Sequence, residues 1–209
     1  AFELISNKQK IICNSGYGKY LSPKLISLSR STAAHSTLYL NNTSSCVFQK
    51  NQSINKVYGN SLIEKHRIIY KNYAEDKDFY SIIASHNGYE KKFGYIHTRS
   101  IKISKANDKI FGLDELKKTK NHSNSVIYFV RFHIYPNTKI VKTKAGNSII
   151  ISLISGEGWL LNSETNSFEI EKNIFLGNKN KIINNESIYI SGNIDGEITS
   201  IKWAIERVS

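Results

Sequence analysis

The sequence is short of the features that usually fix a protein's compartment. It contains no methionine, two prolines and two cysteines in 209 residues. It has no run of about eighteen consecutive apolar residues, and the first residues, Ala1-Phe2-Glu3-Leu4, lack the basic and then apolar pattern of a signal peptide. We therefore expect neither a membrane span nor an export signal in these residues. The missing initiator methionine predicts that they begin inside a longer or processed polypeptide.

Familiar catalytic signatures are missing as well. The sequence has no Gly-rich phosphate loop, no Gly-x-Ser-x-Gly elbow and no His-Glu-x-x-His zinc motif. Cys13 and Cys46 permit at most one disulfide and are not spaced as a metal-binding pair, so we expect two free, buried thiols. Candidate chemistry therefore rests on the histidines and their neighbours.

Acidic residues are few relative to basic ones. The chain has 29 Lys and Arg against 17 Asp and Glu, and residues 1–104 hold fifteen of the basic residues but only six of the acidic ones. The net charge of +12 would concentrate a polyanion such as nucleic acid, anionic lipid or a uronic-acid polysaccharide. The alternative is compositional, because Lys outnumbers Arg 24 to 5 in a chain rich in Ile and Asn. A nucleic-acid partner is disfavoured, since no recognition-helix, RRM or OB signature occurs.

The apolar residues occur mainly in short β-branched or aromatic runs that end at Asn, Gly, Ser or Lys. Residues 10–13 stop at an Asn-Ser-Gly sequence, and residues 37–40 stop at Asn41-Asn42. Such punctuation is typical of strands followed by turns. The predicted fold is all-β, a large antiparallel β-sandwich.

Three later segments predict core strands. Residues 126–135 alternate so that one face is wholly apolar, and residues 201–205 place Trp203 between two inward-facing isoleucines. Residues 149–154 show no alternation, which predicts a strand in the middle of a sheet that is covered on both faces.

Helical signals are sparse. The best lies near residues 23–29, where Ser22 is placed as the N-cap and Pro23 at the first helical position. No repeat occurs, and we expect residues 1–209 to form a single β-sandwich unit. The polar connector at 117–125 is the candidate for an internal boundary.

Three histidines occupy positions that could serve a site. His35 opens a predicted strand, His86 lies at a strand-to-turn junction before Gly88, and His97 lies in a strand that reaches Arg99. A lone strand histidine is more often half-buried and hydrogen-bonded than functional. Spacing alone therefore leaves both interpretations open for each of them.

A resemblance to a known family adds to this picture, and it is carried by short segments in a fixed order. The segments are Phe2-Glu3-Leu4, Ile11-Ile12-Cys13-Asn14-Ser15-Gly16, Arg30-Ser31-Thr32-Ala33-Ala34-His35-Ser36-Thr37-Leu38, Ser85-His86-Asn87-Gly88-Tyr89-Glu90-Lys91-Lys92-Phe93-Gly94-Tyr95-Ile96-His97-Thr98-Arg99, Val130-Arg131-Phe132-His133-Ile134-Tyr135-Pro136, Ser155-Gly156-Glu157-Gly158-Trp159 and Ile201-Lys202-Trp203-Ala204. Together they resemble the carboxyl-terminal β-sandwich part of heparinase II/III-type polysaccharide lyases. The resemblance covers essentially the whole chain, and its collinearity is more specific than any one motif.

This resemblance implies a two-part enzyme that acts on an acidic polysaccharide. In the family an α-helical toroid supplies much of the sugar cleft and a β-sandwich closes it. Cleavage is by β-elimination, in which a base removes the C5 proton of a uronic acid and an acid protonates the departing glycosidic oxygen. The toroid and the family's preceding histidine motif would lie upstream of residue 1, so we expect these residues alone to be inactive. The resemblance also favours a bacterial protein that is periplasmic or secreted.

The resemblance assigns candidate roles to individual residues. The candidate catalytic residues are His35, His86 and Tyr89, and the candidate substrate-binding residues are Lys91, Lys92, His97 and Arg99. Some family members bind zinc through two histidines and an aspartate. His35 matches the second histidine, while Asn14 falls at the aspartate, where a neutral amide is a weaker ligand. The alternatives are an orienting, hydrogen-bonded His35 and a structural turn with a packed Tyr89.

Two functions of different classes follow. The first is the β-sandwich part of a polysaccharide lyase that cleaves a uronic-acid-containing anionic polysaccharide by β-elimination. The second is a non-catalytic module that binds acidic glycans or packs against a separate toroid. Heparin-like, alginate-like and bacterial capsular uronates share the carboxylate that the reaction needs, so the predicted substrate is a class.

Overall fold

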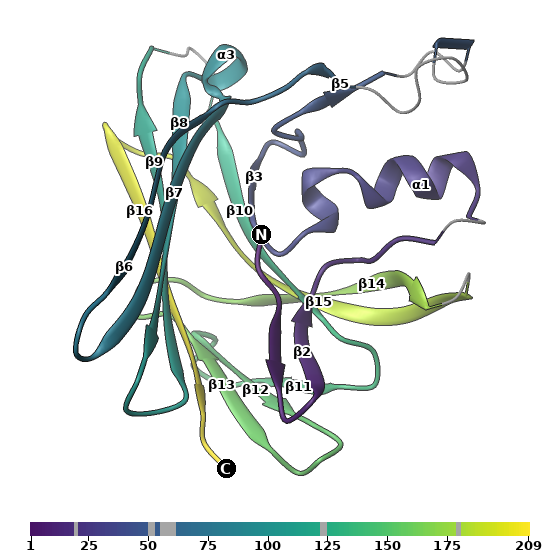
Figure 1. Cartoon of the computed structure of the whole chain (residues 1–209), viewed down its shortest axis with the longest axis vertical. Coiled ribbons are helices and arrows are strands. Elements are labelled where there is room, and N and C mark those ends of the chain that lie inside the picture. The colour runs from purple at the N-terminus through teal and green to yellow at the C-terminus, as the bar shows by residue number, and fades with distance from the viewer. Residues whose placement is uncertain (19–20, 50–52, 55–61, 122–124, 179–180) are drawn as a thin grey trace.

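The chain is an antiparallel β-sandwich, as the sequence predicts, with two sheets that face each other across one hydrophobic core (Figure 1). The computed structural model describes residues 1–18, 21–49, 53–54, 62–121, 125–178 and 181–209. The smaller sheet contains β1 (Leu4–Ser6), β2 (Gln9–Cys13), β3 (Leu38–Leu40), β10 (Ile127–Ile134), β14 (Glu169–Asn178) and β15 (Lys181–Asn193). Its strand order is β1-β2-β10-β15-β14, and β3 also pairs with β10.

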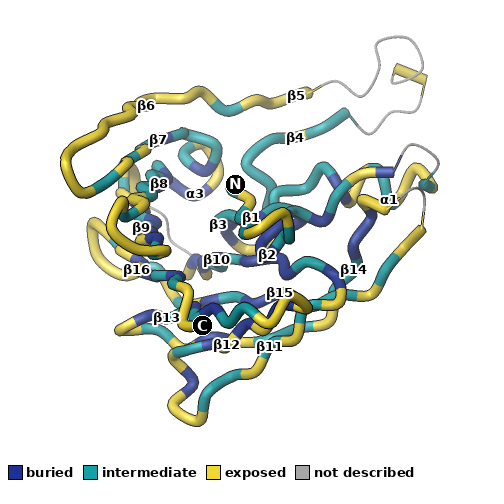
Figure 2. The backbone as a smooth tube through the Cα atoms, turned by 60° about the horizontal axis from the view of Figure 1, so that its bottom comes forward, coloured by how far each residue is buried: buried dark blue, intermediate teal, exposed yellow. Residues whose placement is uncertain are grey.

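The larger sheet has eight strands and bends around the core. They are β6 (Ile68–Glu75), β7 (Phe79–Tyr89), β8 (Tyr95–Ser104), β9 (Lys109–Lys118), β11 (Lys139–Lys142), β12 (Ser148–Ser152), β13 (Gly158–Asn162) and β16 (Ile198–Arg207). The order is β11-β12-β13-β16-β9-β8-β7-β6. Figure 2 shows the sheet curving from β6 round to β11, so that its concave face is turned towards the smaller sheet.

Short elements connect the strands at one end of the sandwich. They are α1 (Pro23–Ser29), the 3-10 turn η1 (Thr32–Ala34), β4 (Val47–Phe48), β5 (Leu62–Glu64) and α3 (Glu90–Phe93). The predicted helix is confirmed as α1, because Pro23 opens it and the Ser22 side chain accepts a hydrogen bond from the Leu25 N–H at 3.4 Å. Among the described residues, no helix is long and apolar enough to cross a membrane.

Alternation of side chains along the strands builds the core. In β10 the predicted apolar face is confirmed, since Tyr128, Val130 and Phe132 are all buried. Trp203 is also a core residue, as predicted, with 3% of its surface exposed. One cluster of packed apolar residues runs through the chain from Ile11 to Ile205.

Residues 149–154 differ from the prediction. β12 does lie inside the sheet, between β11 and β13, but its burial alternates. Ile149 and Ile151 have no exposed surface, whereas Ile150 is 41% exposed and Ile154, beyond the strand, is 76% exposed. The prediction required cover on both faces, and a two-layer sandwich covers only one face of each sheet.

The polar connector at 117–125 begins with the last residues of β9, and the residue that follows β9 is still hydrogen-bonded to the sandwich. The Thr119 N–H donates to the Gly94 carbonyl oxygen at 2.8 Å, which ties the connector to the turn before β8. Residues 122–124 lie outside the described residues. Although the core cluster draws residues from both sides of the connector, a boundary there stays a prediction.

The tightest approach in the core lies between Gly112 on β9 and the indole of Trp203 on β16. A Cβ atom at Gly112 would lie 2.0 Å from Cε2 of Trp203, so a side chain cannot fit there without movement. The indole also stacks on Phe2 at 5.3 Å between ring centroids and meets Phe132 of the smaller sheet edge-on at 5.0 Å. Because Gly112 has no side chain, the Trp203 indole, which contacts both sheets, can lie against the β9 backbone.

We predict that Gly112→Ala lowers the free energy of unfolding by about 3 kcal/mol, the upper part of the usual range for overpacked cores. The new methyl group would collide with a buried ring that cannot swing away. Gly158→Ala is the matched control, because its Cβ would come too close only to the Ser209 hydroxyl, 2.5 Å away at the end of a side chain that can rotate, and would lie at ordinary contact distance, 3.4 Å, from Val208 Cγ2. Urea denaturation of both variants measures the difference, and equal losses would contradict the packing argument.

Candidate functional site

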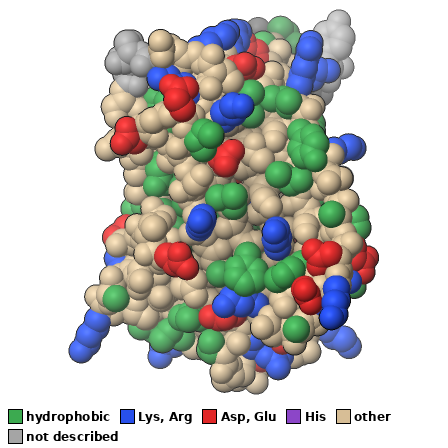
Figure 3. All heavy atoms as spheres, turned by 90° about the vertical axis from the view of Figure 1, so that its left-hand side faces the viewer, with side chains coloured by type: hydrophobic (Ala, Val, Ile, Leu, Met, Phe, Trp, Pro, Cys, Tyr) green, Lys and Arg blue, Asp and Glu red, His purple; other side chains and the backbone are tan. Residues whose placement is uncertain are grey.

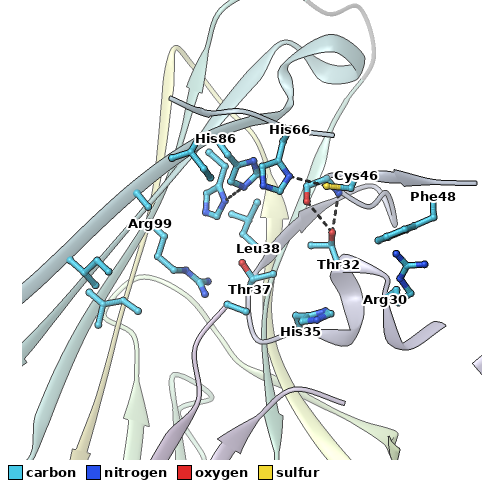
Figure 4. Close-up of a pocket in the computed structure, with 17 residues that line it drawn as sticks. Arg30, Thr32, His35, Thr37, Leu38, Cys46, Phe48, His66, His86 and Arg99 are labelled. Atoms are coloured by element: carbon cyan, nitrogen blue, oxygen red, sulfur yellow. Dashed lines mark hydrogen bonds between the residues drawn. The ribbon is translucent and has the colours of Figure 1, made fainter. Parts of the chain in front are cut away.

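A cavity of about 420 Å³ opens between the concave side of β6 to β8 and the segment that carries η1, β4 and β5 (Figure 4). Its guanidinium and imidazole groups come from Arg30, His35, His66, His86, His97 and Arg99. None of the described lining residues is an Asp or a Glu, and apolar side chains such as Leu38 and Ile82 complete the wall. This lining suits an anionic group attached to an uncharged body.

A buried carboxylate organises the wall formed by the larger sheet. Asp114 on β9 has no exposed surface, and its Oδ1 accepts hydrogen bonds from His97 Nε2 and Arg99 Nε, both at 2.7 Å. Its Oδ2 accepts from Arg99 Nη2 at 2.8 Å and from Trp203 Nε1 at 3.0 Å. The register of β8 and β9 places Arg99 opposite Asp114. All these partners are needed because an unpaired buried charge is strongly destabilising.

Asp114 is ionised and His97 is neutral at pH 7. Burial alone would raise the pKa of Asp114, but the Arg99 guanidinium and the His97 hydrogen bond outweigh it and hold that pKa well below its usual range. Burial lowers the pKa of His97, although Asp114 opposes the shift. The His97 proton therefore resides on Nε2, where it is donated to Asp114, and Nδ1 carries a lone pair.

His86 continues this chain of hydrogen bonds. Because His97 Nδ1 accepts, His86 Nε2 is the donor across the 3.1 Å between them, and His86 Nδ1 accepts from the Gly88 N–H at 3.1 Å. Burial, followed by the proximity of His97, lowers the pKa of His86 to about 3. Both of its ring nitrogens are engaged and the ring is neutral. These contacts make His86 a positioning residue, and its predicted catalytic role is untested.

His35 presents an unengaged ring nitrogen at the cavity. Its Nδ1 lies 2.9 Å from the Ser31 carbonyl oxygen, so Nδ1–H donates and Nε2 keeps its lone pair. No described residue is hydrogen-bonded to that Nε2. The residue caps η1 rather than opening a strand, since β3 begins only at Leu38. In Figure 4 His35 lies on one side of the cavity, and His66 and His86 lie on the other.

His66 is a cavity residue that sequence reasoning missed. It follows β5 in a polar segment with no motif, and its Nδ1 lies 2.9 Å from Cys46 Sγ. Its ring packs against His86 at 4.8 Å between centroids. Both cysteines are free: Cys46 is half-buried beside His66, and Cys13 is buried, which raises the pKa of the Cys13 thiol to about 12.

Two of the predicted site residues are largely withdrawn into the protein. Tyr89 has no exposed surface, its hydroxyl donates to the Leu38 carbonyl oxygen at 3.1 Å, and burial raises its pKa. Arg99 lines the cavity but is 9% exposed, and its Nη1 donates to the Ser36 carbonyl oxygen at 2.8 Å. Tyr89 thus packs in the core, Arg99 braces the wall, and a direct role for either stays a prediction.

Lys91 and Lys92 lie on the surface, on α3. Lys91 forms an ion pair with Glu64 of β5, and Lys92 Nζ donates to Thr43 Oγ1 at 2.9 Å. Neither lines the cavity, but both help to attach the segment from β3 to β5 to the larger sheet. Their predicted contact with substrate is untested.

His133 on β10 holds the segment that carries His35. Its Nε2 donates to the Ala33 carbonyl oxygen at 2.9 Å, and its Nδ1 accepts from Asn173 Nδ2 at 2.5 Å. The His133 N–H donates to Ser36 Oγ at 2.9 Å. Burial lowers the pKa of His133 to about 4, so the ring is neutral near pH 7.

Comparison with known proteins decides the family. Residues 1–204 match the family described as heparinase II/III-like, C-terminal. The chain belongs to this family. Among curated protein sequences, none matches the chain.

This heparinase II/III-like chain shares its fold with solved lyases. It is similar to the heparan sulfate lyase HepC from Pedobacter heparinus, with a TM-score of 0.75 and 15% identity over 99% of this chain and 30% of that one. It is similar to heparinase III with a TM-score of 0.68 and 12% identity over 99% of this chain and 28% of that one. The chain therefore spans less than a third of the length of either lyase.

The zinc site implied by the family resemblance would draw on His35 and Asn14, but both polar atoms of the Asn14 side chain are already hydrogen-bonded. Asn14 Oδ1 accepts from the Ser36 N–H at 3.0 Å, and Asn14 Nδ2 donates to Glu3 Oε1 at 3.1 Å. Within the described ranges, no group of three or more His, Cys, Asp or Glu side chains is arranged to hold a metal ion. His35 and Asn14 alone supply fewer protein ligands than a zinc ion takes, and zinc binding stays a prediction.

We predict that acid destabilises the protein partly through His133. Its folded-state pKa of about 4 lies below the value of about 6.5 expected in the unfolded chain, so the unfolded state takes up the proton first as pH falls. Stability is thus full above pH 6.5 and declines towards pH 4. Between pH 7 and pH 5 this histidine should remove roughly 2 kcal/mol.

His133→Gln supplies the control, because glutamine can still donate to the Ala33 carbonyl but does not titrate. Urea denaturation at pH 7 and pH 5 should show a smaller pH effect in the variant than in the wild type. An unchanged pH effect would assign the acid sensitivity to other groups.

Proposed function

We propose that this chain is the β-sandwich part of a polysaccharide lyase that cleaves a uronic-acid-containing anionic polysaccharide by β-elimination. The cavity is the observation that carries the proposal, because its basic and imidazole lining has no described acidic member and includes His35 with an unengaged Nε2. Membership of the heparinase II/III-like family and the fold shared with heparan sulfate lyases support it.

The reaction asks the protein to neutralise the sugar carboxylate and to move two protons. Asp114 already neutralises the charge of Arg99, so Arg99 holds the cavity wall in place but adds little net positive charge to it. Arg30, whose guanidinium lies 4.0 Å from the Phe48 ring centroid, contributes a second guanidinium to the lining. A uronate carboxylate would bind on this side, near His35.

His35 is the residue of this chain best suited to hold or transfer a proton at its Nε2. The ring is oriented through Nδ1 by Ser31, an arrangement in which a hydrogen bond at one nitrogen sets the role of the other. His66 faces it across the cavity, with Nδ1 beside Cys46. In this proposal the partner acid or base comes from the helical toroid that the family resemblance implies.

A non-catalytic module that binds acidic glycans is the second candidate. It is favoured by the state of two candidate catalytic residues, because Tyr89 has no exposed surface and both ring nitrogens of His86 are engaged within the protein. Its cavity would then hold an acidic sugar without cleaving it.

We predict that residues 1–209 alone do not turn over uronic polymers, whereas the protein at its natural length does. The products of β-elimination carry an unsaturated uronate that absorbs near-ultraviolet light, so a panel of heparan sulfate, alginate and capsular polysaccharides can be screened directly. Turnover by residues 1–209 would show that both proton-transfer groups lie within this chain. Binding without turnover in either form would favour the glycan-binding module.

We predict that His35→Ala lowers kcat/KM of the natural-length protein by at least about a hundredfold, which is the usual contribution of a general acid or base. His35→Asn is the matched control, because its amide can replace Nδ1–H at Ser31 but has no group at the position of Nε2. If Nε2 acts in the chemistry, both variants are inactive and the melting temperature changes little. Recovery of activity in His35→Asn would instead show that the residue acts only by orienting the loop.

A further inference from the structure

The outer face of the larger sheet carries a second hollow, of about 630 Å³, which we call the outer groove. It is lined by Gly112 and the buried Trp203 and, around them, by Ser100, Lys102, Lys109, Phe111, Leu113, Asn147, Ser148, Asn162, Ser163, Glu164, Lys202 and Ala204. Side chains alternate across a strand, so positions such as Lys102, Phe111 and Ala204 point away from the core that holds the side chains of Ile101 and Trp203. The outer groove therefore lies on the opposite face of β8 from the cavity lined by His35, His66, His86 and His97, which we call the histidine cavity.

Strand register explains the shape of the outer groove. Lys102, Phe111, Ala204 and Asn162 are successive partners across β8, β9, β16 and β13, which makes one row about 14 Å long. Leu113 and Lys202 are partners in the next row. Ala204 contributes only a methyl group to this row, whereas its neighbour Phe111 and, beyond it, Lys102 have long side chains.

Several polar side chains of the outer groove have no partner among the described residues and could therefore bind a ligand. Lys102 and Lys202 are exposed, and neither forms an ion pair with a described residue. The Asn162 side chain likewise has no hydrogen bond to any described residue, although it is half-buried. Lys109 differs, since it pairs with Glu206 at 2.7 Å. Figure 3 looks onto this side of the molecule, where basic side chains stand beside apolar ones.

Phe111 provides a fixed apolar surface beside these lysines. It is 38% exposed, and its ring is held edge-on by Phe79 at 6.1 Å between centroids. Lys109 Nζ lies 5.3 Å from the same ring centroid. A partly exposed ring that is braced from the side can pack on the face of a ligand without losing much conformational freedom.

We propose that the outer groove is a second binding site for an anionic polysaccharide. Lys102 and Lys202 would receive sugar carboxylates or sulfates, Phe111 would pack on a sugar ring, and Asn162 would bond its hydroxyls. Glu164 is the acidic member of the lining and repels the polymer at that border. The identity of the ligand class rests on the proposed function, but the site itself does not.

Nucleic acid fits these groups less well. Binding of single strands relies on several exposed aromatic rings that stack successive bases. Of the two aromatic residues that line the outer groove, Phe111 is 38% exposed, whereas Trp203 is only 3% exposed and belongs to the core. The Phe111 ring, the Asn162 amide and the two lysines suit a ligand that has many hydroxyl groups and a few anionic groups. A long polymer could occupy the outer groove while another part of it enters the histidine cavity, which would raise its effective concentration there.

The test compares Lys102→Gln/Lys202→Gln with Lys139→Gln/Lys172→Gln in the natural-length protein. Both pairs remove two exposed lysines that form no ion pair with a described residue, but the control pair lies on β11 and β14. The probes are heparan sulfate polymer and a heparan sulfate tetrasaccharide, with binding followed by calorimetry at low and physiological salt. We expect the groove pair to weaken polymer binding about fivefold, with less than a twofold change in the control.

Turnover separates this inference from the proposed function. The groove pair should raise KM for the polymer and leave kcat, and turnover of the tetrasaccharide, unchanged. Phe111→Ala should weaken polymer binding similarly without any change of charge. If the two lysine pairs behaved alike, the proposed binding site in the outer groove would be wrong, while the proposed lyase function would be unaffected. The same conclusion would follow if a DNA duplex bound as tightly as heparan sulfate through the same lysines. Polymer binding that depends on the groove lysines but is not followed by turnover would support the binding site in the outer groove and contradict the proposed lyase function.

Discussion

The buried carboxylate of Asp114 sets the geometry on both sides of the cavity. A charge in the core needs matched donors, and Asp114 obtains them from His97 and Arg99 on β8 and from Trp203 on β16. The His97 bond fixes the tautomer that in turn orients His86, while Arg99 reaches across to the Ser36 carbonyl next to His35. One anion therefore joins the central strands of the larger sheet to the loop that carries the best candidate for proton transfer.

Much of the fold follows from local pattern. The alternation within 126–135, the turn residues after each short apolar run and the Ser22 cap each predict their element correctly, because strand period and capping act within a few residues. Residues 149–154 show the limit of that reasoning. An unbroken run of isoleucines does not say which face is covered, and here Ile150 points out of the sandwich.

The site was only partly predictable, because long-range register builds it. Sequence reasoning named His35, His86 and His97, and the structure brings all three to one cavity. It did not find Asp114 or His66. Asp114 has a signal in hindsight, since it shares the strand phase of the buried Ile110 and Leu116, where a carboxylate must have a partner. His66 has none, because only the packing of the segment after β5 carries it to His86.

The period of two that builds the core also gives the larger sheet two different faces. On β8, Arg99 and Ile101 face the cavity, and Ser100 and Lys102 between and beyond them face the outer groove. A slip of one residue would exchange these two sets, placing Lys102 in the core and Arg99 in water. Asp114 opposes such a slip, because only the observed register satisfies its carboxylate. The same buried ion pair that orients the cavity histidines thus also fixes which lysines the opposite face presents.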